Sequence, residues 1–310
     1  MPARSQSISA TTRFAAVFGH PIKHSASPAM HNAAIDRLGL DWRYLAFDVH
    51  PDQLAVAIKG AQSMKFLGLN LTVPHKVLAL HLVDELDLSA KTWGAVNTIL
   101  FEAQCASEDW RPLRLCDPDQ ITALRSHGFN TDADAIIRSI REDLEIELRG
   151  ATILLLGAGG AGRTAALKLA SEGVKKLYLV NRTRSKADEI ARELKSRSEH
   201  GPQVAIEVGY PEGNIDLVVN ATSLGLSPAD PLPFDPAQFS LNSTPAAYDM
   251  IYRPAETLFL AEAARAGAKT ANGLGMLLYQ GAKALEIWSG EKAPVEVMCE
   301  ALRENIYGKV

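Results

Sequence analysis

The chain has 310 residues, of which 47% are hydrophobic and 22% charged, and its formal net charge is −4. This length is large for a single hydrophobic core, so two domains are expected, and the composition is that of a folded globular protein. The basic residues are dispersed apart from one cluster at 182–186, and the apolar runs are far shorter than a membrane span, which argues against nucleic-acid-binding and transmembrane proteins.

The first residues and the cysteines bear on where the protein works. Residues 1–12 are polar and contain no hydrophobic segment of the signal-peptide type. The three cysteines, Cys105, Cys116 and Cys299, are an odd number without the spacing of metal ligands. We therefore expect a cytoplasmic protein with reduced, structural cysteines and no metal site.

Short apolar runs and helix-period segments alternate along the first 100 residues. The predicted strands and helices lie at 14–18, from Pro28, at 44–49, 51–64, 68–73 and 75–84. Proline is tolerated at the first position of a helix, where its missing N–H leaves no hydrogen bond unmade. Alternating strands and helices predict an α/β fold with a mostly parallel sheet.

Residues 101–127 lack a clear period and hold two of the three cysteines. We interpret this segment as an enlarged surface hairpin. The alternative is a loop that covers a cleft or binds a partner, and no chemistry is assigned to it.

Polar residues gather in three motifs of this first domain. They are Asn70, Thr72, His75 and Lys76 in GLNLTVPHK, Asn97 and Thr98 in GAVNTI, and Asn130, Thr131 and Asp132 in GFNTD. Ligands of open parallel sheets bind beyond the carboxyl ends of the strands, so the motifs are expected to converge. Each also has a structural interpretation, in which Lys76 is a solvated lysine, Asn97 completes a turn and Asp132 is a helix N-cap.

The stretch 151–187 holds the most informative motif. An apolar run at 152–156 leads into Gly157, Gly159, Gly160 and Gly162, and a helix-period segment and a second apolar run at 176–180 follow. Such a βαβ unit binds a dinucleotide pyrophosphate on the free N–H groups of the helix N-terminus. The alternative is a purely structural tight turn.

The end of the second strand indicates which dinucleotide binds. An NAD site usually has an acidic residue there for the ribose 2′-hydroxyl, whereas this chain has Asn181, followed by Arg182, Thr183, Arg184 and Lys186. Cations and hydroxyls suit a 2′-phosphate, which favours NADP. The alternative is a basic, solvated helix start, although cations oppose the dipole of a helix N-terminus.

More strands are expected at 204–208, 216–220 and 247–249, and the chain is predicted to be helical from Gly273 onward. The last helices are expected to pack back onto the first domain. A cleft between two such domains is a common place for substrate and cofactor to meet.

Taken in order, the motifs resemble those of the shikimate dehydrogenase family, which includes shikimate/quinate dehydrogenases. Besides the motifs above, the resemblance rests on GHPIKHSASPAMHN, GAGGAGR with NRTRSKA, NATSLGL, YDMIY and GLGMLLYQGAKALEIW, and 101–127 is its main gap. It implies a substrate-binding domain of residues 1–131, completed by helices in 273–310. It also implies a Rossmann-type NADP-binding domain of residues 132–272.

The resemblance implies a reversible, NADP-linked interconversion of 3-dehydroshikimate and shikimate in aromatic amino-acid biosynthesis. Lys76 and Asp132 would form the catalytic dyad. Hydride reduction of a ketone leaves an alkoxide that needs a proton and a nearby positive charge, which a lysine supplies. A neighbouring carboxylate orients the ammonium group and favours its charged form.

The resemblance also implies the binding residues. Ser25 and Ser27 would hold the substrate carboxylate, although Ser27 is also a candidate N-cap. The ring hydroxyls would bind Asn70, Thr72, Asn97 and Gln280, with Tyr248 lining the pocket. The implied NADP-binding residues are Gly157, Ala158, Gly159, Gly160, Ala161, Asn181, Arg182, Thr183, Arg184, Lys186, Thr222, Ser223, Met250 and Gly273.

Departures from the family pattern leave alternatives open. Ala133, Asp134 and Ala135 stand where the family usually has glycines, and Asp134 would either perturb the dyad or begin a helix favourably. Quinate as substrate and NAD as cofactor are the near alternatives, and a non-catalytic ligand sensor is the distant one. The expected partner is a small-molecule substrate, and the protein would be a monomer or a homodimer.

Overall fold

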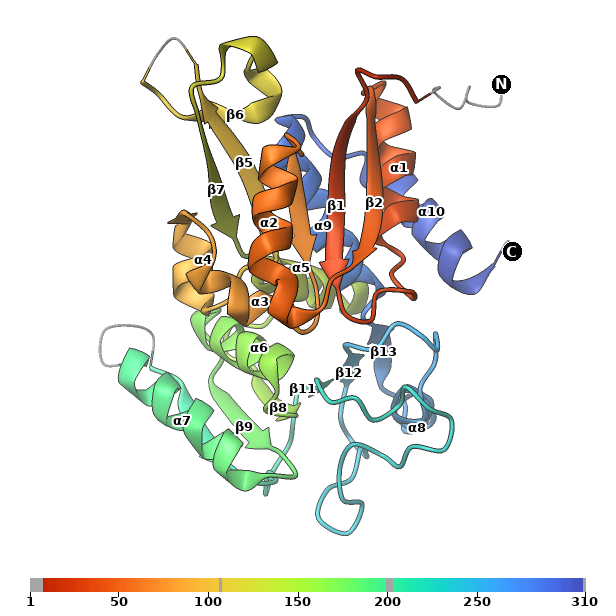
Figure 1. Ribbon diagram of the computed structural model, residues 1–310. Helices are drawn as coiled ribbons and strands as arrows, with labels where there is room; N and C mark the ends of the chain where they lie inside the picture. The colour runs from red at the N-terminus through yellow and green to blue at the C-terminus, as the bar shows by residue number, and fades with distance from the viewer. Residues whose placement is uncertain (1–7, 106–107, 199–202, 309–310) are drawn as a thin grey trace. The chain divides into compact units, whose positions relative to one another are not determined.

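The computed structural model describes residues 8–105, 108–198 and 203–308. The chain divides into two compact units (Figure 1). Unit 1 comprises Met1–Asp132 and Leu278–Val310, and unit 2 comprises Ala133–Leu277. These divisions fall inside two continuous helices, α5 (Asp132–Leu144) and α9 (Leu274–Ser289), a few residues from the boundaries expected at 131/132 and 272/273.

Unit 1 is built on one sheet. Its strands run in the order β2 (Trp42–Asp48), β1 (Arg13–Gly19), β3 (Gly68–Leu71), β5 (Thr98–Gln104), β7 (Ala123–Phe129) and β4 (Glu85–Leu86), with β6 (Arg111–Pro112) paired to β5. β1 is parallel to both β2 and β3. The α/β class is therefore confirmed, but this sheet is mixed, because β5 is antiparallel to β3 and to β7.

The reversed direction of β5 has a local cause and a consequence for function. Between β3 and β5 the chain does not cross back over the sheet, so β5 begins beside the end of β3, and Asn70 pairs with Thr98. Thr98 in turn pairs with Phe129 at the end of β7. The end of β3, the start of β5 and the end of β7 therefore meet at one edge, where the three polar motifs lie.

Helices and the C-terminal segment complete unit 1. They are α1 (Ser27–Leu38), η1 (Pro51–Gln53), α2 (Leu54–Ser63), α3 (His75–Leu78), η2 (Ala79–His81), α4 (Leu88–Trp93), η3 (Leu113–Leu115), η4 (Pro118–Gln120) and α10 (Val295–Tyr307). The helix predicted at 51–64 is present, with a 3₁₀ first turn. α10 packs against α1 (Figure 1).

The segment 101–127 forms the expected hairpin, from β5 into β7, with β6, η3 and η4 in its connection. The expectation that it lies on the surface is wrong in part. Phe101, Ala103, Leu113 and Cys116 are buried in the core with Phe18 and Leu69. Because both faces of β5 are covered, its residues show no polar–apolar alternation, which explains the missing period.

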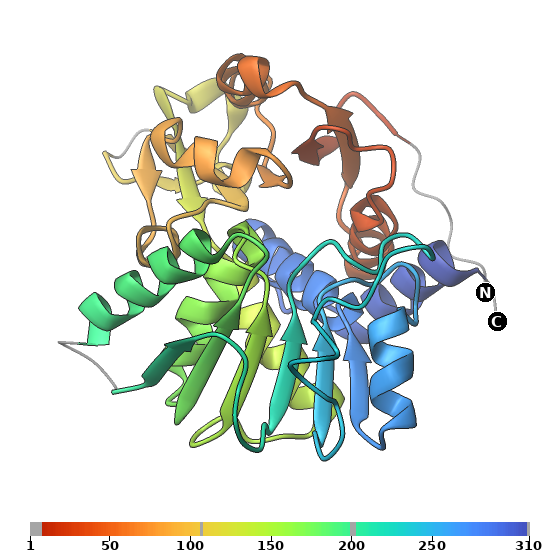
Figure 2. The ribbon, with the colours of Figure 1, turned by 90° about the horizontal axis from the view of Figure 1, so that it is seen from below.

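Unit 2 is a doubly wound domain (Figure 2). Its six parallel strands run in the order β10 (Ala205–Val208), β9 (Lys176–Val180), β8 (Thr152–Leu156), β11 (Leu217–Asn220), β12 (Ala246–Asp249) and β13 (Lys269–Asn272). The helices are α5, α6 (Gly160–Ser171), α7 (Arg184–Ser198) and α8 (Leu258–Arg265). This strand order is that of a dinucleotide-binding fold, which confirms the predicted Rossmann type.

In the described residues, no helix has the length and apolar character needed to cross a bilayer.

Candidate functional site

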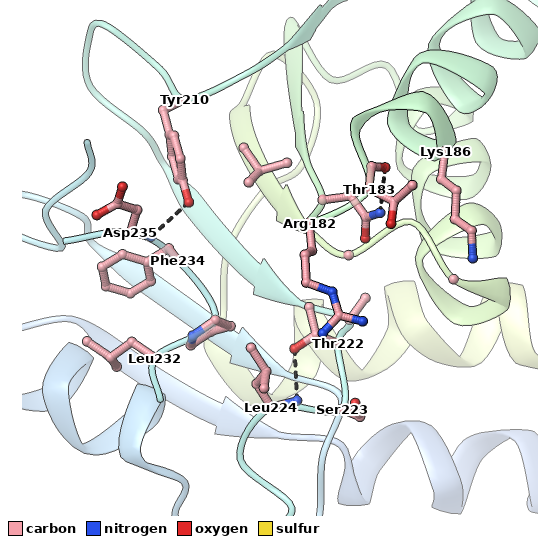
Figure 3. A pocket seen from close by; sticks show the side chains of 16 residues that line it. Arg182, Thr183, Lys186, Tyr210, Thr222, Ser223, Leu224, Leu232, Phe234 and Asp235 are labelled. Atoms are coloured by element: carbon pink, nitrogen blue, oxygen red, sulfur yellow. Dashed lines mark hydrogen bonds between the residues drawn. The ribbon is translucent and has the colours of Figure 1, made fainter. Parts of the chain in front are cut away.

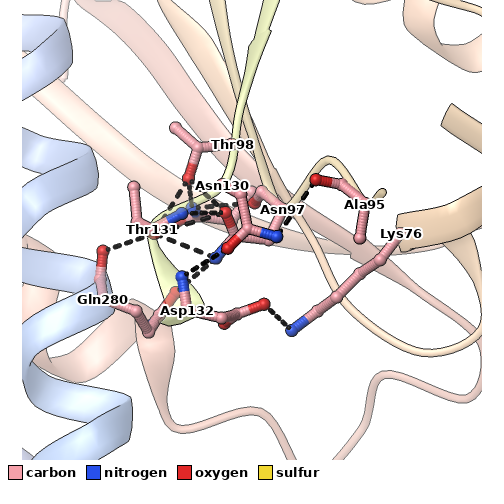
Figure 4. Close-up of polar contacts among 9 residues, drawn as sticks. Lys76, Ala95, Asn97, Thr98, Asn130, Thr131, Asp132 and Gln280 are labelled. Atoms are coloured by element: carbon pink, nitrogen blue, oxygen red, sulfur yellow. Dashed lines mark hydrogen bonds and ion pairs between the residues drawn. The ribbon is translucent and has the colours of Figure 1, made fainter. Parts of the chain in front are cut away.

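Lys76 and Asp132 meet at the motif-bearing edge of unit 1 (Figure 4). The Lys76 Nζ lies 2.8 Å from the Asp132 carboxylate, and the two side chains are 31% and 9% exposed. The Lys76 carbonyl accepts a hydrogen bond from Val96 N–H at 2.8 Å. The carboxylate therefore anchors the ammonium group, while the lysine side chain keeps part of its surface exposed.

Asn130 holds the backbone of Asp132. Its Oδ1 accepts a hydrogen bond from Asp132 N–H at 3.1 Å, and its Nδ2 donates to the Ala95 carbonyl at 3.1 Å. Asp132 is the first residue of α5. The loop before β5 and the end of β7 are thereby tied together next to the Lys76–Asp132 pair.

Asn97, Thr131 and Gln280 form a buried network beside that pair (Figure 4). Thr131 N–H donates to Asn97 Oδ1 at 2.8 Å, and Asn97 Nδ2 donates to Thr131 Oγ1 at 2.9 Å and to Gln280 Oε1 at 3.5 Å. The Thr131 hydroxyl donates to the Gln280 carbonyl at 3.1 Å. The structure therefore brings the predicted residues Asn97 and Gln280 together, with Asn97 only 1% exposed.

Asn70 is also buried, at 4% exposure. Its Oδ1 accepts from the Tyr44 hydroxyl at 2.7 Å, and its Nδ2 donates to Thr98 Oγ1 at 3.1 Å. Burial raises the pKa of Tyr44, and a hydrogen bond with Ser27 acts against that shift. Tyr44 thus connects two residues predicted to bind substrate, and sequence reasoning missed it. The signal that could have identified Tyr44 is its place in a predicted strand, because a buried tyrosine hydroxyl needs a hydrogen-bond partner.

Ser27 is not the N-cap of α1. The helix begins at Ser27 itself, the N-cap is Ala26, and no side chain caps the end. Ser27 N–H donates to Ser25 Oγ at 3.4 Å, so the two predicted carboxylate-binding serines are neighbours at this helix N-terminus. Thr72 follows β3, with its methyl group packed close to Gly19.

Tyr248 is a core residue of unit 2 and does not line a pocket. It is 0% exposed, and its hydroxyl is hydrogen-bonded to Ser139 at 2.9 Å. The prediction is wrong because Tyr248 lies within β12, where both faces are covered. Tyr252 lies beyond the carboxyl end of this strand and keeps part of its surface exposed. It is the better candidate for a tyrosine that meets a ligand.

Two other acid–base candidates are accounted for. His75 is buried, and burial lowers the pKa of its imidazole, which favours the neutral form. Asp134 forms an ion pair with Lys168 at 2.9 Å, within unit 2. Asp134 lies in the first turn of α5, where a carboxylate is favourable.

Eight of the predicted cofactor residues line a pocket of about 710 Å³ at the carboxyl ends of the unit 2 strands (Figure 3). Those that line it are Gly157, Gly159, Asn181, Arg182, Thr183, Lys186, Thr222 and Ser223. Ala158 and Gly160 line an adjoining depression. The same surface is completed by residues that sequence reasoning missed, among them Tyr210 and the segment 232–235.

The glycines of the loop between β8 and α6 have two different roles. A Cβ on Gly162 would lie 2.1 Å from the Gly157 carbonyl oxygen, and one on Gly157 would lie 2.8 Å from the Ala221 carbonyl oxygen. These two glycines permit close packing. A Cβ on Gly159 or Gly160 would meet nothing within 4 Å, so their backbone borders open space, as a bound pyrophosphate requires.

The residues after β9 also have two different roles, since Asn181 holds the backbone whereas Arg182 and Lys186 border the pocket. Ala158 N–H donates to Asn181 Oδ1 at 3.0 Å, and Asn181 Nδ2 donates to the Thr183 carbonyl at 2.8 Å, so Asn181 holds the glycine loop to the end of β9. Arg182 and Lys186 are exposed at the pocket. A dinucleotide with a 2′-phosphate fits this combination of open glycine backbone and cationic wall.

Four of the predicted cofactor residues line neither this pocket nor the adjoining depression: Ala161, Arg184, Met250 and Gly273. The Arg184 guanidinium instead donates to the Val208 carbonyl of β10 at 3.4 Å and lies 4.0 Å from the Asp188 carboxylate of α7. Met250 and Gly273 pack on each other, since a Cβ on Gly273 would lie 2.1 Å from the Met250 carbonyl oxygen.

Comparison with known proteins adds three family matches. The family model described as shikimate dehydrogenase substrate binding domain matches residues 17–99 of this chain. The family model described as shikimate / quinate 5-dehydrogenase matches residues 139–223. The model described as shikimate 5′-dehydrogenase C-terminal domain matches residues 273–303.

Individual relatives cover nearly the whole chain. A shikimate dehydrogenase (NADP(+)) of Methanopyrus kandleri is 39% identical over 310 residues, covering 97% of this chain and 99% of the relative. A solved shikimate 5-dehydrogenase of Thermus thermophilus, in complex with NADP(H) and shikimate, is 35% identical with a TM-score of 0.77, covering 94% of this chain and 99% of that one. A quinate dehydrogenase of Corynebacterium glutamicum in complex with NAD is 27% identical with a TM-score of 0.76, covering 94% and 98%.

Proposed function

Because the chain belongs to the shikimate dehydrogenase family, we propose that it catalyses the reversible reduction of 3-dehydroshikimate to shikimate with NADPH. The observation that carries this proposal is the 2.8 Å pair of Lys76 and Asp132 at the edge of the unit 1 sheet. We assign substrate binding to unit 1 and NADP binding to unit 2.

The chemistry of unit 1 follows from the pair. NADPH, when bound, supplies the hydride. The Lys76 ammonium group stabilises the negative charge that grows on the substrate oxygen and donates a proton to it. Asp132 orients the ammonium group through the hydrogen bond between them. In the direction of oxidation the same lysine accepts the proton of the substrate hydroxyl.

The polar groups around the pair fit a small polyhydroxy acid. Ser25 and Ser27 lie at the N-terminus of α1, where free N–H groups suit a carboxylate. Asn70, Asn97 and Gln280 would bind ring hydroxyls after exchanging some of their present partners for the ligand. Within the same proposal, Tyr252 replaces Tyr248 as the tyrosine that meets the substrate.

The pocket of unit 2 favours NADP over NAD. Arg182 and Lys186 line it, and the residue at the end of β9 is Asn181 rather than a carboxylate. We also place the enzyme in the cytoplasm, because its three cysteines are free thiols, as a reducing compartment maintains them.

The test is steady-state oxidation of shikimate and of quinate, each with NADP⁺ and with NAD⁺, followed at the absorbance of the reduced nicotinamide. We expect kcat/KM to be highest for shikimate with NADP⁺. Equal or higher values with quinate or NAD⁺ would move the protein to the quinate/shikimate branch. No turnover in any of the four assays, by folded protein that binds NADPH, would contradict the proposed substrate.

A further inference from the structure

Two of the three cysteines meet within the hairpin segment 101–127, to which the sequence assigned no chemistry. Cys105 directly follows β5, at the opposite end of that strand from Thr98 and the motif-bearing edge. Cys116 directly follows η3, which packs against β5. Cys116 is buried, at 7% exposure, in the apolar core cluster of unit 1, and Cys105 packs against the same cluster. The hairpin therefore holds two thiols in one place in the core.

The two thiols contact each other, and the backbone beside each of them is held. The Cys116 thiol is hydrogen-bonded to the Cys105 thiol. Next to Cys105, the Gln104 carbonyl accepts a hydrogen bond from Thr122 N–H at 2.9 Å. Cys116 N–H donates to the Leu113 carbonyl at 3.2 Å. Because the thiols are already neighbours, a covalent bond between the two sulfurs requires little rearrangement of the chain.

The two thiols differ in access and in acidity. Cys105 keeps part of its surface exposed, whereas Cys116 is buried. Burial raises the pKa of the Cys116 thiol to about 11, and the neighbouring Cys105 thiol acts in the same direction, while Arg111 and Arg13 oppose the shift. Since the thiolate is the nucleophile, Cys105 is the thiol that reacts first with a dissolved oxidant. Oxidation of Cys105 removes its thiolate charge and thereby one of the causes that keep Cys116 protonated.

We propose that Cys105 and Cys116 are a redox-modification site, at which hydrogen peroxide closes a reversible disulfide. The Cys105 thiolate attacks the O–O bond of the peroxide and becomes a sulfenic acid, and the hydroxide that leaves takes up the thiol proton to form water. The Cys116 sulfur then attacks the Cys105 sulfur, and the sulfenic hydroxyl leaves with the Cys116 proton as a second water.

The two sulfurs together give two electrons to the peroxide. A dithiol such as dithiothreitol returns two electrons and two protons by thiol–disulfide exchange, which restores both cysteines. The disulfide closes the loop between Cys105 and Cys116 and so restricts the unfolded chain, which stabilises unit 1. This chemistry requires neither shikimate nor NADP.

The test treats the reduced, full-length protein with an equimolar amount of hydrogen peroxide, blocks the remaining thiols under denaturing conditions and measures the mass. Before blocking, the oxidised chain should be lighter by two hydrogen atoms, and only Cys299 should take up the blocking reagent. Trypsin cleaves after Arg114, between the two cysteines, so the disulfide should appear as two linked peptides. Dithiothreitol should separate the peptides again. Oxidation should also raise the urea midpoint of unit 1 by about 1 M.

Three variants assign the steps. Cys299→Ser is the matched control and should form the disulfide to the same extent as the wild type. Cys116→Ala keeps an apolar side chain in the core and should stop at the Cys105 sulfenic acid, heavier by one oxygen atom and trapped by dimedone. Cys105→Ser leaves only the buried thiol of the pair, which should react with peroxide about tenfold or more slowly. If Cys116→Ala does not fold, Cys105→Ser alone provides the test.

Three results would overturn the redox site. The first is a folded wild type that keeps three reactive thiols after treatment with peroxide. The second is a disulfide between two chains, or one that includes Cys299, in place of the linked peptides of Cys105 and Cys116. The third is oxidation of Cys105→Ser at the rate of the wild type. None of these results bears on the proposed dehydrogenase function, which is measured separately.

Discussion

The Lys76 ammonium group and the Asp132 carboxylate lie 2.8 Å apart although 56 positions separate them in the chain. The reversed strand β5 brings them together, because it places the end of β3 beside the end of β7. Asn130 then fixes the backbone at Asp132, and Val96 fixes the backbone at Lys76. The pair is a product of sheet topology and of these hydrogen bonds.

Removal of the lysine tests its proposed catalytic role. Lys76→Ala should lower kcat by about 10²- to 10⁴-fold, because the reaction loses its proton donor and the positive charge near the substrate oxygen. Steady-state kinetics measure this. Lys91→Ala is the control. Lys91 is an exposed lysine of the same unit, and its Nζ lies 3.4 Å from the Glu85 carboxylate. Near-normal turnover by a folded Lys76→Ala protein would exclude the dyad.

Charge reversal at Arg182 tests whether this residue recognises the 2′-phosphate of the cofactor. Arg182→Asp should raise the Kd of NADPH at least about tenfold more than that of NADH, because only NADPH carries the 2′-phosphate. Fluorescence titration with both cofactors measures the ratio. Arg192→Asp makes the same charge change at an exposed position of α7 outside the pocket lining. If Arg182→Asp raises the Kd of NADPH and the Kd of NADH by the same factor, Arg182 does not distinguish the two cofactors.

The open glycine backbone gives a prediction that separates binding from folding. Gly159 has φ −78° and faces open space, so alanine fits there without strain. Gly159→Ala should therefore keep the Tm of the wild type but weaken NADPH binding about tenfold or more, because its methyl group occupies the pyrophosphate position. Gly213→Ala, also in open space but away from the pocket, should alter neither quantity. Unchanged NADPH affinity in Gly159→Ala would place the pyrophosphate elsewhere.

Gly68 on β3 permits the close approach of Trp288. A Cβ on Gly68 would lie 2.1 Å from the indole Nε1, whose N–H donates to the Ile99 carbonyl at 2.9 Å. Gly68→Ala should therefore lower the free energy of unfolding of unit 1 by about 1–3 kcal/mol. All four tryptophans belong to unit 1, so urea unfolding followed by tryptophan fluorescence reports on that unit.

The control for this change is Gly60→Ala in α2, where a Cβ meets nothing within 4 Å. It should be neutral or stabilising by up to about 1 kcal/mol, because alanine is the better helix former. Equal destabilisation by the two substitutions would show that the contact with Trp288 does not limit residue 68.

His31 makes the stability of unit 1 depend on pH. It is fully buried and stacked on Tyr44 with 4.1 Å between centroids, and burial lowers its pKa to about 3. Between that value and the unfolded value of about 6.5, the unfolded chain binds the extra proton. His31 therefore makes stability fall as the pH decreases through this window, by up to about 1.4 kcal/mol per pH unit.

Substitution of the imidazole should remove this dependence. For His31→Phe, the free energy of unfolding should change less between pH 7.5 and pH 5 than it does for the wild type. Urea unfolding at the two pH values, followed by tryptophan fluorescence, measures the difference. An identical change in both proteins would mean that His31 takes up a proton as readily in the folded protein as in the unfolded chain.

Much of unit 2 could be predicted from sequence because its signals are local. The apolar runs of β8 and β9 match the structure residue for residue, and the glycines between them occupy the positions that backbone geometry requires. Spacing of this kind depends on chain neighbours alone. For the same reason the cluster at Arg182 and Lys186 was correctly located at the end of β9.

Only the tertiary structure decided which side chains meet. The direction of β5 depends on where the chain re-enters the sheet, and periodicity carries no such information. Tyr248 and Tyr252 share one motif, yet the first is enclosed in β12 and the second lies beyond it. The hydroxyls of Tyr44 and Tyr210 are hydrogen-bonded to Asn70 and Asp235, residues distant from them in the chain. The motifs therefore identify the chemistry, whereas burial and non-local hydrogen bonds, which form only on folding, select the residues that face the ligands.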